Sequence, residues 1–89
     1  MSVNATETSN RAIAERICDH WNDDWEPAPY VKMGAGVILP YLRALTESEI
    51  MDAIAITLSK GHLREDARVP YLRGVLLGKL IDIAAEARR

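Results

Sequence analysis

Cys18 and the two histidines are the side chains best suited to nucleophilic chemistry. Cys18 is the only cysteine, and His20 stands two positions after it. Residues two apart on a helix point in different directions, so these two side chains do not form a thiol–imidazole pair by themselves. His62 is distant in sequence and would reach Cys18 only through the fold. The sequence therefore predicts no catalytic residues and a non-enzymatic protein.

Acidic residues around His20 offer oxygen ligands, but their spacing does not match a metal site. No second cysteine pair or His-x-x-x-His element accompanies them, and the glycine of a calcium-binding loop is missing. Gly34-Ala35-Gly36 lacks the third glycine and the Gly-Lys-Ser/Thr ending of a phosphate-binding loop. We therefore expect neither a metal nor a cofactor.

The segment from Trp21 to Tyr30 is the leading candidate for a partner-binding surface. Its aromatic residues are suited to anchoring an interface, and its acids are suited to meeting a basic protein surface. The alternative is that both tryptophan rings fill the core while the acids face water. The residues predicted to contact the partner are Asp19, Trp21, Asp23, Asp24, Trp25, Glu26 and Tyr30.

A second candidate surface, for DNA, lies toward the C-terminus. It consists of four cations, which would contact phosphates: Arg64, Arg68, Arg73 and Lys79. The charge balance opposes it, because the chain has a net charge of −2 and acidic residues interleave with these cations. The alternative interpretation is an ordinary solvated helix face.

Gly74 and Gly78 stand four residues apart in an apolar stretch that is expected to be helical. A glycine inside a helix costs about 0.8–1 kcal/mol relative to alanine. That cost favours close approach of another backbone, either within the fold or across a homodimer.

The apolar spacing predicts helices that carry these residues. Ile13, Ile17 and Trp21 recur every four residues and predict a helix over 9–22, preceded by a flexible tail over 1–8. Residues 9–89 form a single domain in this interpretation. A short irregular piece over 30–37 would lead to a helix that begins at Pro40.

Thr46 and Glu49 match a capping box, which predicts a buried central helix from there to about Lys60, closed by a left-handed Gly61. We expect a charged loop over 62–68 and a last helix from Pro70 to about Ala87. No stretch shows the alternation of a strand, so the fold class is all-α, with four or five helices.

The sequence Pro40-Tyr41-Leu42-Arg43 recurs thirty positions later as Pro70-Tyr71-Leu72-Arg73. Either two related helical units share it, or two apolar helices begin with the same favourable proline.

The chain is expected to be cytoplasmic and to have no membrane association. Its first ten residues lack the apolar run of a signal peptide, no stretch approaches about 18 uninterrupted apolar residues, and one cysteine fits a reducing compartment.

The stretch from Glu47 to Leu80 resembles the C-terminal helical module of DnaD-like primosomal proteins and phage replisome organisers. The resemblance rests on Glu49-Ile50-Met51-Asp52-Ala53-Ile54 and on Tyr71-Leu72-Arg73-Gly74-Val75-Leu76. It implies an all-α module that contacts DNA and partner proteins during replication initiation. The tryptophan that usually follows the second motif is absent, and Lys79-Leu80 stands in its place.

The function that we predict is a small protein-binding adaptor or inhibitor, of the kind that phages and mobile elements encode, such as an anti-CRISPR-like protein. It would dock a basic partner surface through the acidic aromatic segment. The alternative is a replication or transcription accessory domain that binds DNA through the C-terminal cations.

Overall fold

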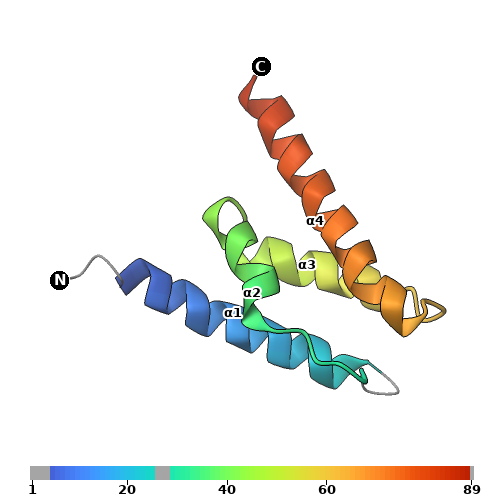
Figure 1. Cartoon of the computed structure of the whole chain (residues 1–89). Helices are drawn as coiled ribbons and strands as arrows, with labels where there is room; N and C mark the ends of the chain where they lie inside the picture. The colour runs from blue at the N-terminus through green and yellow to red at the C-terminus, as the bar shows by residue number, and fades with distance from the viewer. Residues whose placement is uncertain (1–4, 26–28, 89) are drawn as a thin grey trace.

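Five helical elements make up the described part of the chain. The computed structural model describes residues 5–25 and 29–88, and within these ranges it contains no strand. Its elements are the α-helices α1 (Ala5–Asp24), α2 (Ala35–Ile38), α3 (Glu47–Leu58) and α4 (Glu65–Ala87), and the 3-10 helix η2 (Leu39–Arg43). The all-α prediction is confirmed. In Figure 1, α1 runs below the short α2, α3 lies between them and α4, and the end of α4 rises away from the other helices.

Helix α1 forms because its apolar residues recur every three or four positions. Ala14, Ile17, Cys18 and Trp21 follow this spacing, Trp25 continues it directly after the last residue of the helix, and all five are buried. The helix starts at Ala5, so the prediction of a tail over 1–8 is wrong for residues 5–8. Those residues contain no glycine or proline, and nothing in them breaks a helix that begins further on.

Pro40 stands at the start of a helix, as its missing N–H group predicts, but that helix is η2 rather than an α-helix. The N–H groups of Ala44 and Leu45 both donate to the carbonyl oxygen of Tyr41, at 3.1 and 2.8 Å, which closes the turn. Leu45 and Ile38, on either side of η2, are buried in the core.

The capping box that opens α3 is confirmed. The backbone N–H of Glu49 donates to Thr46 Oγ1 at 3.2 Å, and the N–H of Thr46 donates to Glu49 Oε1 at 2.8 Å. The other end differs from the prediction, because α3 stops at Leu58 and Gly61 does not adopt a left-handed conformation. The Ser59 hydroxyl donates to the carbonyl oxygen of Ile56, and the Lys60 N–H donates to that of Thr57, so the end of the helix is satisfied before Gly61.

Helix α4 begins at Glu65, so the predicted loop over 62–68 is wrong for residues 65–68. Glu65 and Asp66 occupy its first turn, where carboxylates interact favourably with the helix dipole. Pro70 lies inside the helix instead of opening it. The two copies of the Pro-Tyr-Leu-Arg sequence therefore occupy different structural settings, and the interpretation in which both prolines begin a helix holds for Pro40 but is wrong for Pro70.

Two ion pairs connect α3 to its neighbours. Arg16 on α1 donates from Nε and Nη2 to the two carboxylate oxygens of Glu47, at 3.0 and 2.8 Å. These hydrogen bonds lower the pKa of Glu47 and raise that of Arg16. On the other side of α3, Lys79 Nζ lies 2.9 Å from Asp52 Oδ2.

In the described ranges, none of the helices has the length and hydropathy that a bilayer crossing requires.

Candidate partner-binding site

The two tryptophans of the acidic aromatic segment lie in the core. Trp21 is 1% exposed and Trp25 is 5% exposed, and their rings meet edge to face with centroids 5.3 Å apart. The prediction that these rings contact a partner is therefore corrected to the alternative, in which they fill the core. The physical reason is the spacing, because Trp21 and Trp25 continue the four-residue stripe of Ile17.

Arg68 of α4 is part of the same core. Its Cζ atom lies 4.0 Å from the centroid of the Trp25 ring, which is the geometry of a cation–π contact. The residue is 8% exposed, and its Nε and Nη1 atoms are buried without a hydrogen-bond partner. The indole Nε1 of Trp25 is also unpartnered. Arg68 thus joins α4 to α1 and is not placed to contact DNA.

The acids of the segment lie on the surface. Asp19, Asp23 and Asp24 are exposed, and Asp24 Oδ2 lies 2.7 Å from Nε2 of His20, one helical turn earlier. Asp19 and Asp23 are four residues apart and share the face of α1 opposite the buried tryptophans. Glu26 lies outside the described residues. The last two turns of α1 therefore present carboxylates to solvent.

Tyr30 is 93% exposed and Val31 is 76% exposed, the highest values among the large hydrophobic residues that the structure describes as exposed. The structure thus leaves Tyr30 accessible to a partner, and it adds Val31, which the sequence did not single out. The sequence feature that could have indicated Val31 is its position between Pro29 and Gly34, outside any helical stripe that would direct it inward.

The backbone of residues 31–33 is held from both sides. Asn22 on α1 accepts from the N–H of Met33 through Oδ1 at 2.9 Å, and its Nδ2 donates to the carbonyl oxygen of Met33 at 3.2 Å. The N–H of Val31 donates to Glu65 Oε2 on α4 at 3.2 Å. These three hydrogen bonds fix the segment between the end of α1 and the start of α4.

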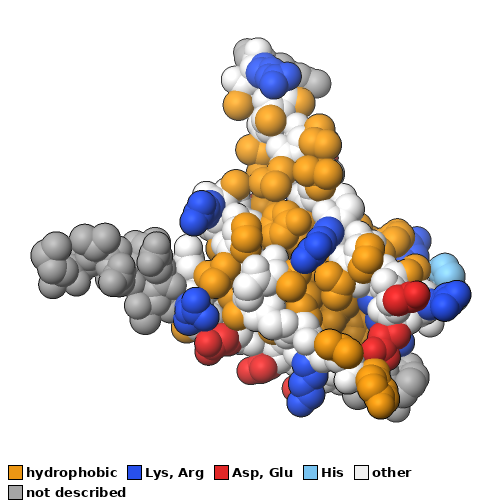
Figure 2. All heavy atoms as spheres, viewed as in Figure 1, with side chains coloured by type: hydrophobic (Ala, Val, Ile, Leu, Met, Phe, Trp, Pro, Cys, Tyr) orange, Lys and Arg blue, Asp and Glu red, His pale blue; other side chains and the backbone are white. Residues whose placement is uncertain are grey.

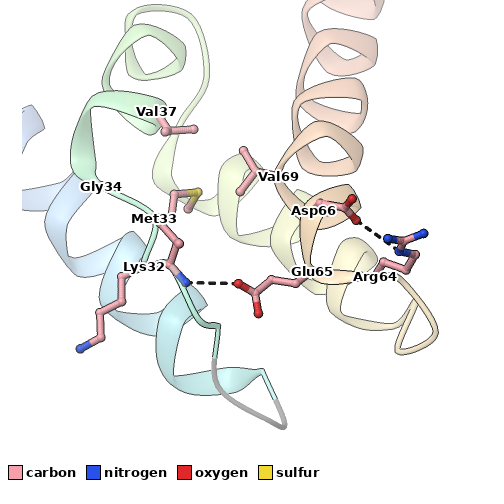
Figure 3. A pocket seen from close by; sticks show the side chains of 9 residues that line it. Lys32, Met33, Gly34, Val37, Arg64, Glu65, Asp66 and Val69 are labelled. Carbon is pink, nitrogen blue, oxygen red and sulfur yellow. Dashed lines mark hydrogen bonds and ion pairs between the residues drawn. The ribbon is translucent and has the colours of Figure 1, made fainter.

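An open groove of about 620 Å³ lies between this segment and the first turns of α4. Figure 3 shows Met33, Val37 and Val69 facing one another across it, with Glu65 on one wall. The complete lining is Val31, Lys32, Met33, Gly34, Val37, Arg64, Glu65, Asp66 and Val69. Two cations and two carboxylates therefore border an apolar floor, which suits an apolar side chain with a polar surround.

Cys18 is buried, which accounts for most of the rise in its pKa to about 11; the charges of Asp19 and Glu15 add to it. Its thiol is therefore protonated near neutral pH, and a protonated thiol is a poor nucleophile. In the described ranges, no three His, Cys, Asp or Glu residues gather in a way that would hold a metal ion.

The predicted basic strip does not form a continuous surface. Arg68 is buried, and Lys79 is ion-paired with Asp52 and has a side chain that is only 25% exposed. Arg73 is exposed but lies about 140° around the helix from Arg68, because five residues span 500° of rotation. Arg64 is exposed, with its Nε 3.6 Å from Asp66 Oδ1. Two of the four cations are thus used inside the fold.

Gly74 and Gly78 do not accommodate a second backbone within the fold. A Cβ atom placed on either glycine would meet nothing within 4 Å. The first interpretation of these residues, close approach inside the chain, is therefore wrong.

Comparisons of the chain with protein-family models, with curated proteins and with solved structures found no match. The resemblance to the DnaD-like module consequently stays a prediction.

Proposed function

We propose that this protein is a small non-enzymatic module that binds another protein, in the manner of an adaptor or a stoichiometric inhibitor. The observation that carries the proposal is the exposure of Tyr30 and Val31 beside an open apolar groove. An exposed tyrosine next to an apolar depression is typical of the central part of a protein interface, where aromatic residues are enriched.

The charges near this site favour a basic partner. Asp19, Asp23 and Asp24 are exposed on the last turns of α1, and Asn22 in the same turns hydrogen-bonds to Met33 on the wall of the groove. A Lys/Arg-rich surface with a protruding apolar side chain complements both features. Proteins that handle nucleic acid offer such surfaces, and a phage or mobile-element inhibitor of the anti-CRISPR type is the form of the proposal that we favour.

The test is a capture of interacting proteins from the native host, followed by titration of the purified partner against variants. Tyr30→Ser and the double variant Asp19→Lys/Asp23→Lys should each weaken affinity at least about tenfold, which corresponds to about 1.4 kcal/mol. Glu86→Lys is the matched control, because Glu86 is exposed near the far end of α4. Affinity that is unchanged in both test variants, or equally weakened in the control, would contradict the proposal.

Binding to DNA is the competing function, and the positions of Arg68 and Lys79 oppose it. Only Arg64 and Arg73 are exposed among the four cations, which leaves at most about two phosphate contacts. A plot of the logarithm of DNA affinity against the logarithm of salt concentration should therefore have a slope no steeper than about −2. Fluorescence anisotropy with labelled DNA checks this. A slope of about −4 or steeper, with binding retained near physiological salt, would favour the DNA-binding alternative.

A further inference from the structure

The second half of α4 has an apolar surface that the rest of the described chain does not cover. Residues 81–88 are all exposed, including Ile81 at 60%, and Leu77 before them is 54% exposed. Figure 2 shows hydrophobic side chains continuing along the projecting part of this helix toward its end. Large exposed apolar patches on a small protein indicate an interaction surface.

The exposed residues are spaced as in a helix-pairing seam. Gly74, Leu77, Ile81 and Ala84 follow one another at intervals of three and four residues. Leu77 and Ile81 lie about 140° and 180° around the helix from Leu72, which faces the core. The seam is thus on the back of α4 and separate from the groove. Gly74, the glycine of this seam, has open space above it, so a second helix has room to approach closely.

The chain exposes more surface than a compact monomer of its mass. The accessible surface of the chain is 6131 Å², whereas a compact monomer of this mass has about 5,200 Å². The radius of gyration is 13.8 Å, against about 12 Å for a compact domain of this length. The excess of roughly 900 Å² belongs to the chain as a whole, and the exposed residues 81–88 of α4 contribute to it.

We propose that the back of α4 pairs with the same face of a second copy of this chain, in antiparallel orientation. With the two-fold axis near Lys79, Leu77 would lie beside Ile81 of the partner subunit, and Gly74 beside the partner's Ala84. Each contact then occurs twice, as a two-fold interface requires. The small residues at both ends of the seam let the backbones approach, while the four large side chains fill its centre.

The charges at the two ends of α4 select the antiparallel orientation. Glu65 and Asp66 are in the first turn, and Arg88 follows the last turn. In an antiparallel pair with this register, Arg88 lies opposite Pro70 of the partner subunit, about one helical turn from the partner's Asp66, and the helix dipoles also oppose each other favourably. A parallel pair would instead place acids beside acids and Arg88 beside its own copy. This complementarity within one helix indicates a second copy rather than an unrelated partner.

The first experiment is sedimentation equilibrium of the full chain from about 1 µM to about 1 mM, a range that spans weak and strong homodimers. We expect the mass of two chains at the upper concentrations. Ile81→Glu should raise the dissociation constant at least about 100-fold, because each dimer would bury two unpaired carboxylates. Ile56→Glu is the matched control, since Ile56 is an exposed isoleucine on α3, and it should leave dimerisation unchanged. A monomer at every concentration, or a dimer that Ile81→Glu does not weaken, would overturn the proposal.

The orientation has a test of its own. Nitroxide labels at residue 88, introduced as Arg88→Cys in a Cys18→Ala background, should lie about 27 Å apart along the helix axis in the antiparallel dimer. A parallel dimer would bring the two labels within about 10–15 Å of each other, the separation of adjacent helices with their side chains. Dipolar spectroscopy distinguishes the two distances, and the short one would refute the antiparallel arrangement.

Discussion

Replacing Arg68 by methionine is expected to stabilise the fold. Arg68 is 8% exposed, its Nε and Nη1 atoms have no hydrogen-bond partner, and its favourable contact is the Trp25 ring at 4.0 Å. Methionine has a similar reach and no polar group to desolvate. Buried charged groups replaced by apolar residues of similar volume are often neutral or stabilising in this way.

The magnitude follows from the two opposing contributions. A cation–π contact that is shielded from water stabilises by about 2 kcal/mol. Each buried donor without a partner costs about 1–3 kcal/mol, so Nε and Nη1 together cost about 2–6 kcal/mol. The difference between them is about 0–4 kcal/mol, and we expect Arg68→Met to raise the free energy of unfolding by an amount in the middle of that range, about 1–3 kcal/mol. At about 4–8 °C per kcal/mol for a domain of this size, the melting temperature should rise by at least about 4 °C.

Urea denaturation followed by far-UV circular dichroism measures this change, provided that the transition is two-state. Protein concentration should be low and constant, because self-association adds to apparent stability. Arg73→Met is the matched control, since Arg73 lies on the exposed face of the same helix, and its effect should stay within about 0.5 kcal/mol. A loss of more than about 1 kcal/mol in Arg68→Met would refute the reasoning, because it would show that the guanidinium is a net source of stability.

Two further predictions concern local features of α1 and α3. Thr46→Ala removes the hydroxyl that accepts from the Glu49 N–H, and urea denaturation should show a free energy of unfolding that is lower by about 1 kcal/mol. Ser48→Ala is the control, because Ser48 is exposed nearby, and it should change this free energy little. Equal effects of the two substitutions would contradict the role of the cap. The pKa of Cys18 is raised to about 11 from an ordinary 9.0, so the folded state holds the thiol proton more tightly than the unfolded state does. The free energy of unfolding should therefore fall as pH rises from about 9 to about 11, and the contribution of the thiol to this fall should be absent in Cys18→Ala. Identical pH profiles for the wild-type protein and Cys18→Ala would show that unfolding does not change the titration of the thiol.

Features set by neighbouring residues were predictable from the sequence. The capping box at Thr46 depends on residues three positions apart, and the buried faces of α1 and α3 depend on a spacing of three and four. The burial of Trp25 was also within reach, because it continues the stripe of Ile17 and Trp21. The predicted helix over 9–22 stops short of Trp25, whereas α1 runs to Asp24, because the turn-favouring residues Asn22-Asp23-Asp24 do not end it.

Features that join distant segments were not predictable in this way. The groove exists because Asn22 binds Met33 and Glu65 binds Val31, and these pairs are 11 and 34 residues apart. No local pattern indicates such pairings. The prediction of a basic strip is wrong for a geometric reason. Arg68 and Arg73 are close in sequence, but the rotation of the helix places Arg73 on a different face from Arg68. Burial of Arg68 against Trp25 depends on how α3, on which α4 packs, brings α4 to the end of α1, and the charge of the side chain argues against this burial.

Helix α4 also has the geometry of a lever. Val69 lines the groove, Leu72 and Leu76 are fully buried, Leu80 packs against the core, and residues 81–88 are exposed. From Val69 to Leu72 is about 5 Å along the axis, and from Leu80 to Ala87 is about 10 Å. A tilt about the residues held in the core therefore moves the free end about twice as far as it moves the groove wall. If that tilt is the coordinate through which the groove and the projecting face communicate, the coupling must be reciprocal, so that occupancy of either surface changes the affinity of the other by the same factor.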